Sequence, residues 1–272
     1  MTELTGAPNL TALYAKAVAT TPTRRGGELP STEYVRRGIR VDPDHLAAYD
    51  RVCGFGLRDE LPITYPHVLS FGMSVKLMTD PGFPFPLVGL VHVANRIEQH
   101  RPLLLTEELT QRVRVADARP HPKGVRFDVL TETEVDGAVV WRETSTYLRR
   151  GPGSGEPSRR EVDAGERTAT WRVPGDLGRR YAAVSGDRNP IHLNPLAAKA
   201  FGFPRAIAHG MWSKARCLAA LRLPESCTVE VDFAKPLLLP STVDFAARRT
   251  EGGRDFALTS RSGKPHLLGT VR

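Results

Sequence analysis

The two halves of the chain carry similar short segments in the same order, and this internal repeat restricts the fold more than any other feature. The matching pairs of segments are residues 49–54 and 181–186, 64–69 and 208–213, and 101–106 and 235–240. The spacing between the pairs varies, so the halves also differ by insertions and deletions. Three matches in one order predict a duplicated structural unit.

A stretch rich in glycine, proline, serine and charged residues separates the two halves. Residues 151–167 show no apolar periodicity and are typical of an interdomain linker. The sequence therefore predicts an N-terminal unit over residues 1–150 and a C-terminal unit over residues 168–272. With 272 residues and 40% hydrophobic content, the chain is long and apolar enough to build real cores.

Each unit has the same coarse plan, a mostly apolar helix followed by strands. The helices are predicted over residues 211–221 and near residues 68–78. Alternating or β-branched runs then predict four C-terminal strands, over residues 227–233, 242–249, 255–261 and 266–271. A helix wrapped by an antiparallel sheet is an α+β arrangement, which is the predicted fold class.

Composition and charge exclude several classes of protein. No stretch approaches the roughly eighteen uninterrupted apolar residues of a membrane span, and residues 1–21 lack the features of a signal peptide. We therefore expect a cytoplasmic protein without membrane association. The net charge is +8, but the arginines are scattered in pairs rather than gathered beside stacking aromatics. We expect no nucleic-acid partner, although some of this charge can attract an acidic carrier or a phosphorylated substrate.

The cysteines give no sign of a disulfide framework or a metal site. Cys53, Cys217 and Cys227 are odd in number, and none lies in a CxxC or histidine-rich spacing. We expect reduced, structural thiols, no metal and no cofactor.

The segment around Asp187 and His192 is the part of the sequence that points to chemistry. Pro190 disfavours a helix through the residues before it, so Asp187 and His192 are expected on one turn, where side chains five residues apart can converge. Asn194 is expected to cap a short helix that begins at Pro195. An aspartate and a histidine held on a rigid turn supply the acid and the base for reversible addition of water to a conjugated double bond.

Gly210 is expected at the start of the predicted C-terminal helix. Backbone N–H groups at a helix N-terminus stabilise the negative charge that develops on a thioester oxygen, and glycine allows close approach. We therefore assign the N–H of Gly210 to an oxyanion hole. Ser185 and Ser213 lie in no GxSxG elbow and are not expected to be nucleophiles. His209 is expected to pack or hydrogen-bond rather than to transfer a proton.

These segments resemble a known family. Residues 185–194 and 203–211 resemble the MaoC-like (R)-specific enoyl-CoA hydratases, and the whole chain looks like the two-repeat 3-hydroxyacyl-thioester dehydratases of actinobacterial type. The resemblance implies a double hot-dog fold, in which two repeats form a pseudo-dimer around one active site, and it leaves open a homodimer of whole chains. It also implies thioester substrates on coenzyme A or acyl carrier protein, in fatty-acid metabolism.

The resemblance assigns roles to particular residues of the C-terminal repeat. Asp187 and His192 correspond to the catalytic pair, Gly210 to the oxyanion glycine, and Asn189 to the residue that orients the pair. The expected substrate-binding set is Ser185, Asn189, His209 and Met211. We expect His192 to remove the α-proton of the hydroxyacyl group while protonated Asp187 serves the departing hydroxyl, although the sequence leaves the opposite division open.

The N-terminal repeat departs from the family pattern. Phe55 stands where Asp187 stands in the second repeat, and about a dozen residues around the position of His192 are missing. We therefore expect one catalytic site per chain, with the first repeat shaping the acyl tunnel. Two alternatives remain at this point: a hot-dog acyl-thioesterase, because one scaffold serves several reactions, and a non-catalytic subunit that binds an acyl carrier.

Overall fold

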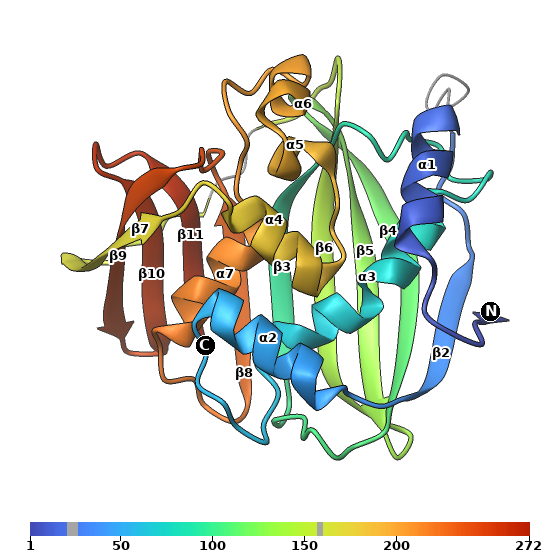
Figure 1. Cartoon of the computed structure of the whole chain (residues 1–272), viewed down its shortest axis with the longest axis horizontal. Coiled ribbons are helices and arrows are strands. Elements are labelled where there is room, and N and C mark those ends of the chain that lie inside the picture. Colours follow the sequence, from blue (N-terminus) through green and yellow to red (C-terminus); the bar gives the residue numbers. More distant parts are fainter. Residues whose placement is uncertain (21–26, 157–159) are drawn as a thin grey trace.

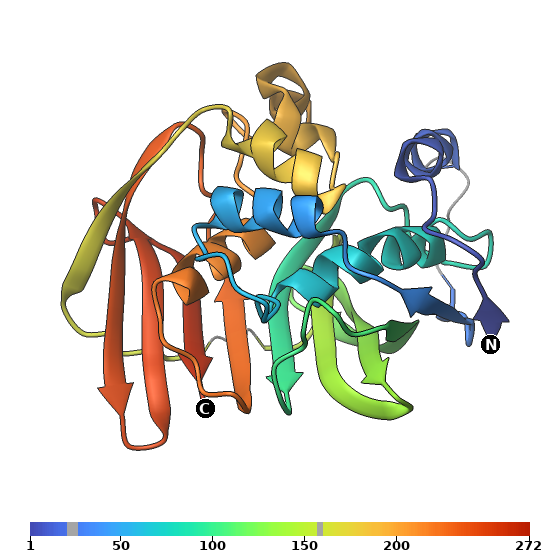
Figure 2. The ribbon, with the colours of Figure 1, turned by 60° about the horizontal axis from the view of Figure 1, so that its bottom comes forward.

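Helices cover one face of an 11-stranded sheet in the computed structural model, which describes residues 1–20, 27–156 and 160–272 (Figures 1 and 2). The N-terminal half contains β1 (Thr2–Glu3), α1 (Leu10–Thr20), β2 (Glu33–Ile39), α2 (Pro43–Cys53), α3 (Tyr65–Met78), β3 (Leu90–Gln99), β4 (Leu109–His121), β5 (Gly124–Val135) and β6 (Ala138–Arg150). The C-terminal half contains β7 (Arg167–Val173), α4 (Leu177–Ser185), α5 (Pro190–Leu193), α6 (Pro195–Ala200), α7 (Gly210–Ala219), β8 (Cys227–Phe233), β9 (Ser241–Thr250), β10 (Gly253–Ser260) and β11 (Pro265–Val271).

The strand order shows that the two halves are copies of one unit. The sheet runs β1-β2-β4-β5-β6-β3-β8-β11-β10-β9-β7, so β3 and β8 meet in its middle. Counted outward from this junction, β3, β6, β5, β4 and β2 correspond to β8, β11, β10, β9 and β7. The predicted duplication is confirmed, and the four predicted C-terminal strands are present with ends shifted by two residues at most.

The junction between β3 and β8 joins the copies through backbone pairing and a shared core. The two strands are antiparallel, with Ile97 opposite Val229. Both side chains are fully buried in a hydrophobic cluster that draws residues from both copies. In the same cluster the rings of Tyr49 and Tyr181, from equivalent helices, lie 6.3 Å apart. The indole N–H of Trp212 also donates to the Val52 carbonyl at 3.0 Å, which ties α7 to α2.

Glycines end the equivalent helices α2 and α4. Gly54 follows α2 with φ 84° and Gly186 follows α4 with φ 74°. This left-handed conformation is readily adopted only by glycine, which explains why both copies of the segment end in that residue. Beyond this point the copies differ, because α5 and α6 follow Gly186, whereas the described residues between Gly54 and α3 form no helix.

Several predicted boundaries need correction. The first helix, α3, begins at Tyr65 rather than near residue 68, and α7 ends at Ala219 rather than at residue 221. His192 lies within α5, so the prediction that it shares a turn with Asp187 was wrong. Between β6 and β7 the described residues form neither helix nor strand, while residues 157–159 of the predicted linker lie outside the described residues. The limits of the two units stay a prediction.

Two further sequence expectations concern the cysteines and the membrane. Cys53, Cys217 and Cys227 are all buried and unpaired. Within the described parts of the chain, no helix combines the length and the apolar character needed to cross a membrane.

Candidate active site

The loop after α4 is built by side chains that bond to their own backbone. The N–H of Asp187 donates to Ser185 Oγ at 3.2 Å, and the N–H of Asn189 donates to Asp187 Oδ1 at 3.1 Å. Asn189 caps α5, whose first residue is Pro190, so the chain turns directly into the short helix that carries His192. Asn194 is the C-cap residue of α5, where its N–H donates to the Pro190 carbonyl. Its side chain caps the start of α6, as predicted.

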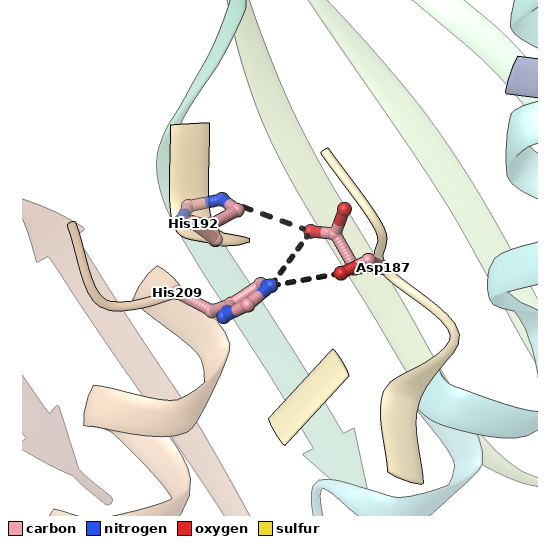
Figure 3. Close-up of side chains that lie close together, drawn as sticks. All are labelled: Asp187, His192 and His209. Atoms are coloured by element: carbon pink, nitrogen blue, oxygen red, sulfur yellow. Dashed lines mark hydrogen bonds and ion pairs between the residues drawn. The ribbon is translucent and has the colours of Figure 1, made fainter. Parts of the chain in front are cut away.

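Three side chains converge at this loop: Asp187, His192 and His209, the last of which is the N-cap residue of α7 (Figure 3). Oδ2 of Asp187 lies 4.0 Å from Nε2 of His192 and 3.7 Å from Nε2 of His209. The side chains of Asp187, His192 and His209 are 24%, 10% and 3% exposed, respectively. Solvent therefore reaches the cluster mainly at the carboxylate of Asp187.

Backbone carbonyls fix the tautomers of the two histidines. Nδ1 of His192 lies 2.8 Å from the carbonyl oxygen of Ile207, and Nε2 of His209 lies 3.0 Å from the carbonyl oxygen of Asp187. A carbonyl oxygen only accepts, so these two nitrogens carry the protons in the neutral rings. His192 therefore presents the lone pair of Nε2 toward Oδ2 of Asp187, whereas His209 supports the backbone of Asp187.

Tyr14 completes the surroundings of the aspartate, although no motif in the sequence pointed to it. Its hydroxyl, on α1, donates to Oδ1 of Asp187 at 2.7 Å. The two residues are 173 positions apart, and α1 lies outside the pattern that the two copies share. A lone tyrosine in an N-terminal helix carries no motif, so a contact of this kind emerges only from the folded chain.

The charges around Asp187 determine its ionisation. Burial by itself raises the pKa of Asp187, but His209, His192, the Tyr14 hydroxyl and the Asn189 N–H outweigh it, and the pKa lies below its usual range. Burial lowers the pKa of His192, against the attraction of Asp187, and it lowers the pKa of His209 to about 3. These directions favour an ionised Asp187 and two neutral imidazoles, rather than the protonated Asp187 that the sequence-based mechanism assumed.

Gly210 begins α7, as predicted, directly after His209. A Cβ atom at this position would lie 3.0 Å from the ring of Phe233, so a larger residue requires that ring to move. Met211 is buried in the main hydrophobic cluster, which draws residues from both copies. Among the expected substrate-binding residues, His209, Ser185 and Asn189 thus surround Asp187, whereas the Met211 side chain serves the core.

The N-terminal copy lacks this arrangement. Phe55, which follows Gly54 as Asp187 follows Gly186, stacks on Tyr49 with ring centroids 6.3 Å apart. Two surface hollows elsewhere on the molecule, one over β3 to β6 and one beside β9 and β10, include none of the three clustered residues.

Asp187, His192 and His209 also form a group with the chemistry of a metal site. One ligand atom from each lies within 4.8 Å of the others. However, Nε2 of His209 bears the proton that it donates to the Asp187 carbonyl, and Oδ1 of Asp187 accepts from Tyr14. A metal ion would have to compete with these hydrogen bonds, so the arrangement fits proton transfer better than metal binding.

The fold and the site together define a double hot-dog protein with an Asp–His cluster in its C-terminal copy. The chain belongs to the MaoC-like dehydratase family. A MaoC like domain matches residues 159–264, and 3-hydroxyacyl-thioester dehydratase X of Mycobacterium tuberculosis is 39% identical, over 100% of this chain and 99% of that protein.

Solved structures support the same fold. The crystal structure of HtdX from Mycobacterium tuberculosis matches with a TM-score of 0.81 and 38% identity, covering 89% of this chain and 99% of that one. An acyl-ACP thioesterase from Bacteroides thetaiotaomicron matches with a TM-score of 0.61 at 12% identity, covering 88% of this chain and 96% of that one. The double hot-dog prediction is confirmed. The likeness to the thioesterase shows the shared fold alone and says nothing about the reaction.

Proposed function

We propose that the chain interconverts (R)-3-hydroxyacyl thioesters and trans-2-enoyl thioesters, with Asp187 and His192 as the pair that moves the proton. Family membership and the full-length likeness to a 3-hydroxyacyl-thioester dehydratase support the reaction class, a hydro-lyase. The observation that carries the residue roles is the 4.0 Å separation between Oδ2 of Asp187 and Nε2 of His192, both unprotonated at rest. The substrates are thioesters of coenzyme A or acyl carrier protein, in fatty-acid metabolism.

Two acceptors at this separation can receive both hydrogens of one water molecule. In the hydration direction the water oxygen bonds to C3 of the enoyl group, and one of its protons passes to the pair. The electrons of the C2–C3 double bond move to the thioester oxygen, which forms an enolate. The pair then returns the proton to C2, so atoms and charge balance and both side chains end as they began.

Dehydration is the same sequence in reverse. The pair removes the proton from C2, the enolate expels the hydroxyl group from C3, and the departing hydroxyl receives the proton that the pair has just taken. This route needs no protonated Asp187 at rest, in agreement with the lowered pKa of that carboxyl. The free lone pair on Nε2 of His192 makes this nitrogen the base toward C2, with Oδ2 of Asp187 beside the hydroxyl.

The start of α7 suits the charge that forms on the thioester oxygen. The first N–H groups of a helix have no partner within it, and the partial positive charge at this end favours an anion. Gly210 is the first residue of α7, and His209, immediately before it, lies in the Asp187 cluster. We assign the oxyanion contact to the N–H of Gly210, where losing such a donor typically costs on the order of a hundredfold in rate.

A hydration assay tests this function directly. Trans-2-enoyl-CoAs of four to sixteen carbons are followed by the loss of enoyl absorbance, with chiral analysis of the product. Asp187→Asn and His192→Gln are expected to lower turnover by about a hundredfold to ten-thousandfold, the usual contribution of a positioned acid or base. Asp163→Asn and His100→Gln, at exposed positions, are the matched controls and should keep wild-type rates.

The same assay separates the competing functions. A thioesterase would release free thiol from acyl-CoA, which a thiol reagent detects in parallel. Near-normal hydration by both Asp187→Asn and His192→Gln would refute the assigned pair. A wild-type protein that binds enoyl-CoA without turnover would instead indicate the non-catalytic alternative.

A further inference from the structure

Helix α1, which is not part of the pattern that the two copies share, reaches the proposed catalytic carboxylate. Among the described residues that precede β7, the C-terminal counterpart of β2, no helix corresponds to α1. Its Tyr14 hydroxyl donates to Oδ1 of Asp187 at 2.7 Å, and the N–H of Asn189 donates to the same oxygen at 3.1 Å. Two donors therefore hold one carboxylate oxygen, while the other, Oδ2, faces His192 and His209.

We propose that Tyr14 is a positioning residue, which holds Asp187 by Oδ1 so that Oδ2 is aimed at His192 and at the substrate. This inference rests on the proposed function, because it assumes that Asp187 takes part in the reaction. Tyr14 acts through Asp187 rather than on the reacting atoms, so α1 supports the active site through this side chain.

Contacts along α1 hold Tyr14 in place. Leu10 packs against Gly186, where an added Cβ atom would lie only 2.4 Å from Leu10 Cδ1. Pro8 lies against Gly72 of α3 in the same way, with Pro8 Cδ 3.2 Å from the position of a Cβ atom. The helix is thus seated on the glycine that precedes Asp187 and on the central helix of the N-terminal copy.

The backbone before α1 is anchored as well. The side chain of Asn9 accepts from the N–H of Ala12 at 3.1 Å, which caps the start of the helix. Upstream, β1 pairs in parallel with β2, and the N–H of Leu4 donates to the Val35 carbonyl at 2.8 Å. A helix fixed at both its start and its underside can hold a hydroxyl at a set distance from a side chain far away in sequence.

The hydrogen bond also has an electrostatic effect that can be measured. Tyr14 donates to the ionised carboxylate, so it contributes to lowering the pKa of Asp187. The other ionisable groups that act on this site are, by element, His192 on α5, His209 at the start of α7, Tyr181 on α4, Tyr147 on β6 and His92 on β3. Removing the Tyr14 hydroxyl leaves all of these in place and should raise the pKa of Asp187.

The test is Tyr14→Phe, assayed with crotonyl-CoA across pH. A hydrogen bond to a charged group typically contributes about 1.5 to 3 kcal/mol, so we expect kcat to fall by about tenfold to a hundredfold with little change in KM. The acidic limb of kcat/KM should move to higher pH, because Asp187 loses its charge earlier as the pH falls. Leu10→Ala keeps the Tyr14 hydroxyl but removes the contact between α1 and Gly186. It should lower kcat and move the acidic limb of kcat/KM to higher pH, each by a smaller amount than Tyr14→Phe.

A matched control is available in Tyr34→Phe. The Tyr34 hydroxyl donates to a carboxylate oxygen of Asp80, so this variant loses the same kind of hydrogen bond away from the site. It should keep the wild-type kcat and the wild-type acidic limb. Thermal unfolding of all variants shows whether an effect comes from loss of structure instead.

The possible outcomes distinguish a failure of the positioning role of Tyr14 from a failure of the catalytic role proposed for Asp187. If Asp187→Asn is inactive while Tyr14→Phe keeps both its rate and its acidic limb, the positioning role is overturned and the function stands. A Tyr14→Phe variant that loses rate and thermal stability with an unmoved acidic limb also overturns it, since Tyr14 would then be structural only. Wild-type activity in Asp187→Asn would instead remove the catalytic role of Asp187, on which this inference rests.

Discussion

The imidazole rings of His192 and His209 are stacked, with centroids 3.7 Å apart and an angle of 26° between the planes. Two charged imidazoles could not remain this close without strong repulsion. Burial lowers the pKa of both rings, and this outweighs the hydrogen bond that each donates to a backbone carbonyl, which acts in the opposite direction. The stack therefore keeps a neutral, unprotonated Nε2 of His192 beside an ionised Asp187.

His209 should matter for activity although we assign it no proton transfer. His209→Ala removes the donor to the Asp187 carbonyl and leaves a gap beside His192. We expect turnover to fall about tenfold and the protein to lose roughly 1–3 kcal/mol of stability. Enoyl-CoA hydration and urea unfolding measure the two effects. His100→Ala, which removes an exposed histidine that also contacts a carbonyl, is the control.

The space at Gly210 should limit substitution there. In Gly210→Ala the new methyl group meets the Phe233 ring at 3.0 Å, so either the ring or the start of α7 must shift. We expect turnover to fall by at least about tenfold, because small displacements of an oxyanion donor are costly. Gly56→Ala is the control, because a Cβ atom at Gly56 meets open space, and it should keep the wild-type turnover. Recovery of activity in the Gly210→Ala/Phe233→Leu double variant would identify the ring as the obstacle.

Buried neutral histidines should make the fold sensitive to acid. Burial lowers the pKa of His92 and of His209 from 6.5 to about 3. Below pH 6.5 the unfolded chain binds protons that the folded chain does not, so stability should fall from there toward pH 3. Urea unfolding at a series of pH values measures this slope. His92→Phe keeps a ring against Tyr147 and should flatten the dependence; an unchanged slope would contradict it.

Metal removal should leave the enzyme active. The proton on Nε2 of His209 and the Tyr14 hydrogen bond occupy parts of the Asp187, His192 and His209 cluster. We expect full hydration activity after extensive treatment with EDTA, and inhibition by added Zn²⁺, which competes for the free lone pair of His192. Activity lost to EDTA and restored by Zn²⁺ would instead indicate a metal-dependent hydratase.

Local features of the sequence predicted the parts of the fold that depend on nearby residues. Asn194 caps α6, as predicted, because its side chain accepts from the N–H groups of Leu196 and Ala197. The duplication supplied the rest of the architecture, since two matching copies must have matching strands. Such signals lie within a few residues of the feature that they predict.

The site itself was only partly predictable, because its geometry depends on distant contacts. His192 was placed on a turn, but Pro190 initiates the short helix that carries it. The pairing of Tyr14 with Asp187 joins residues 173 positions apart. The protonation of Asp187 also depends on burial and on four neighbouring groups, His209, His192, Tyr14 and the Asn189 N–H, so the sequence could not indicate the direction of its pKa shift.

The position of β3 and β8 in the middle of the sheet has a structural consequence. If the copy without an Asp–His pair were cut away, β8 would expose an unpaired backbone edge and a wide apolar surface, both prone to aggregation. The N-terminal copy therefore supports the fold of the C-terminal copy, which carries the Asp–His cluster. Substitutions in the N-terminal copy, across the β3–β8 junction from Asp187, can therefore still disable the enzyme.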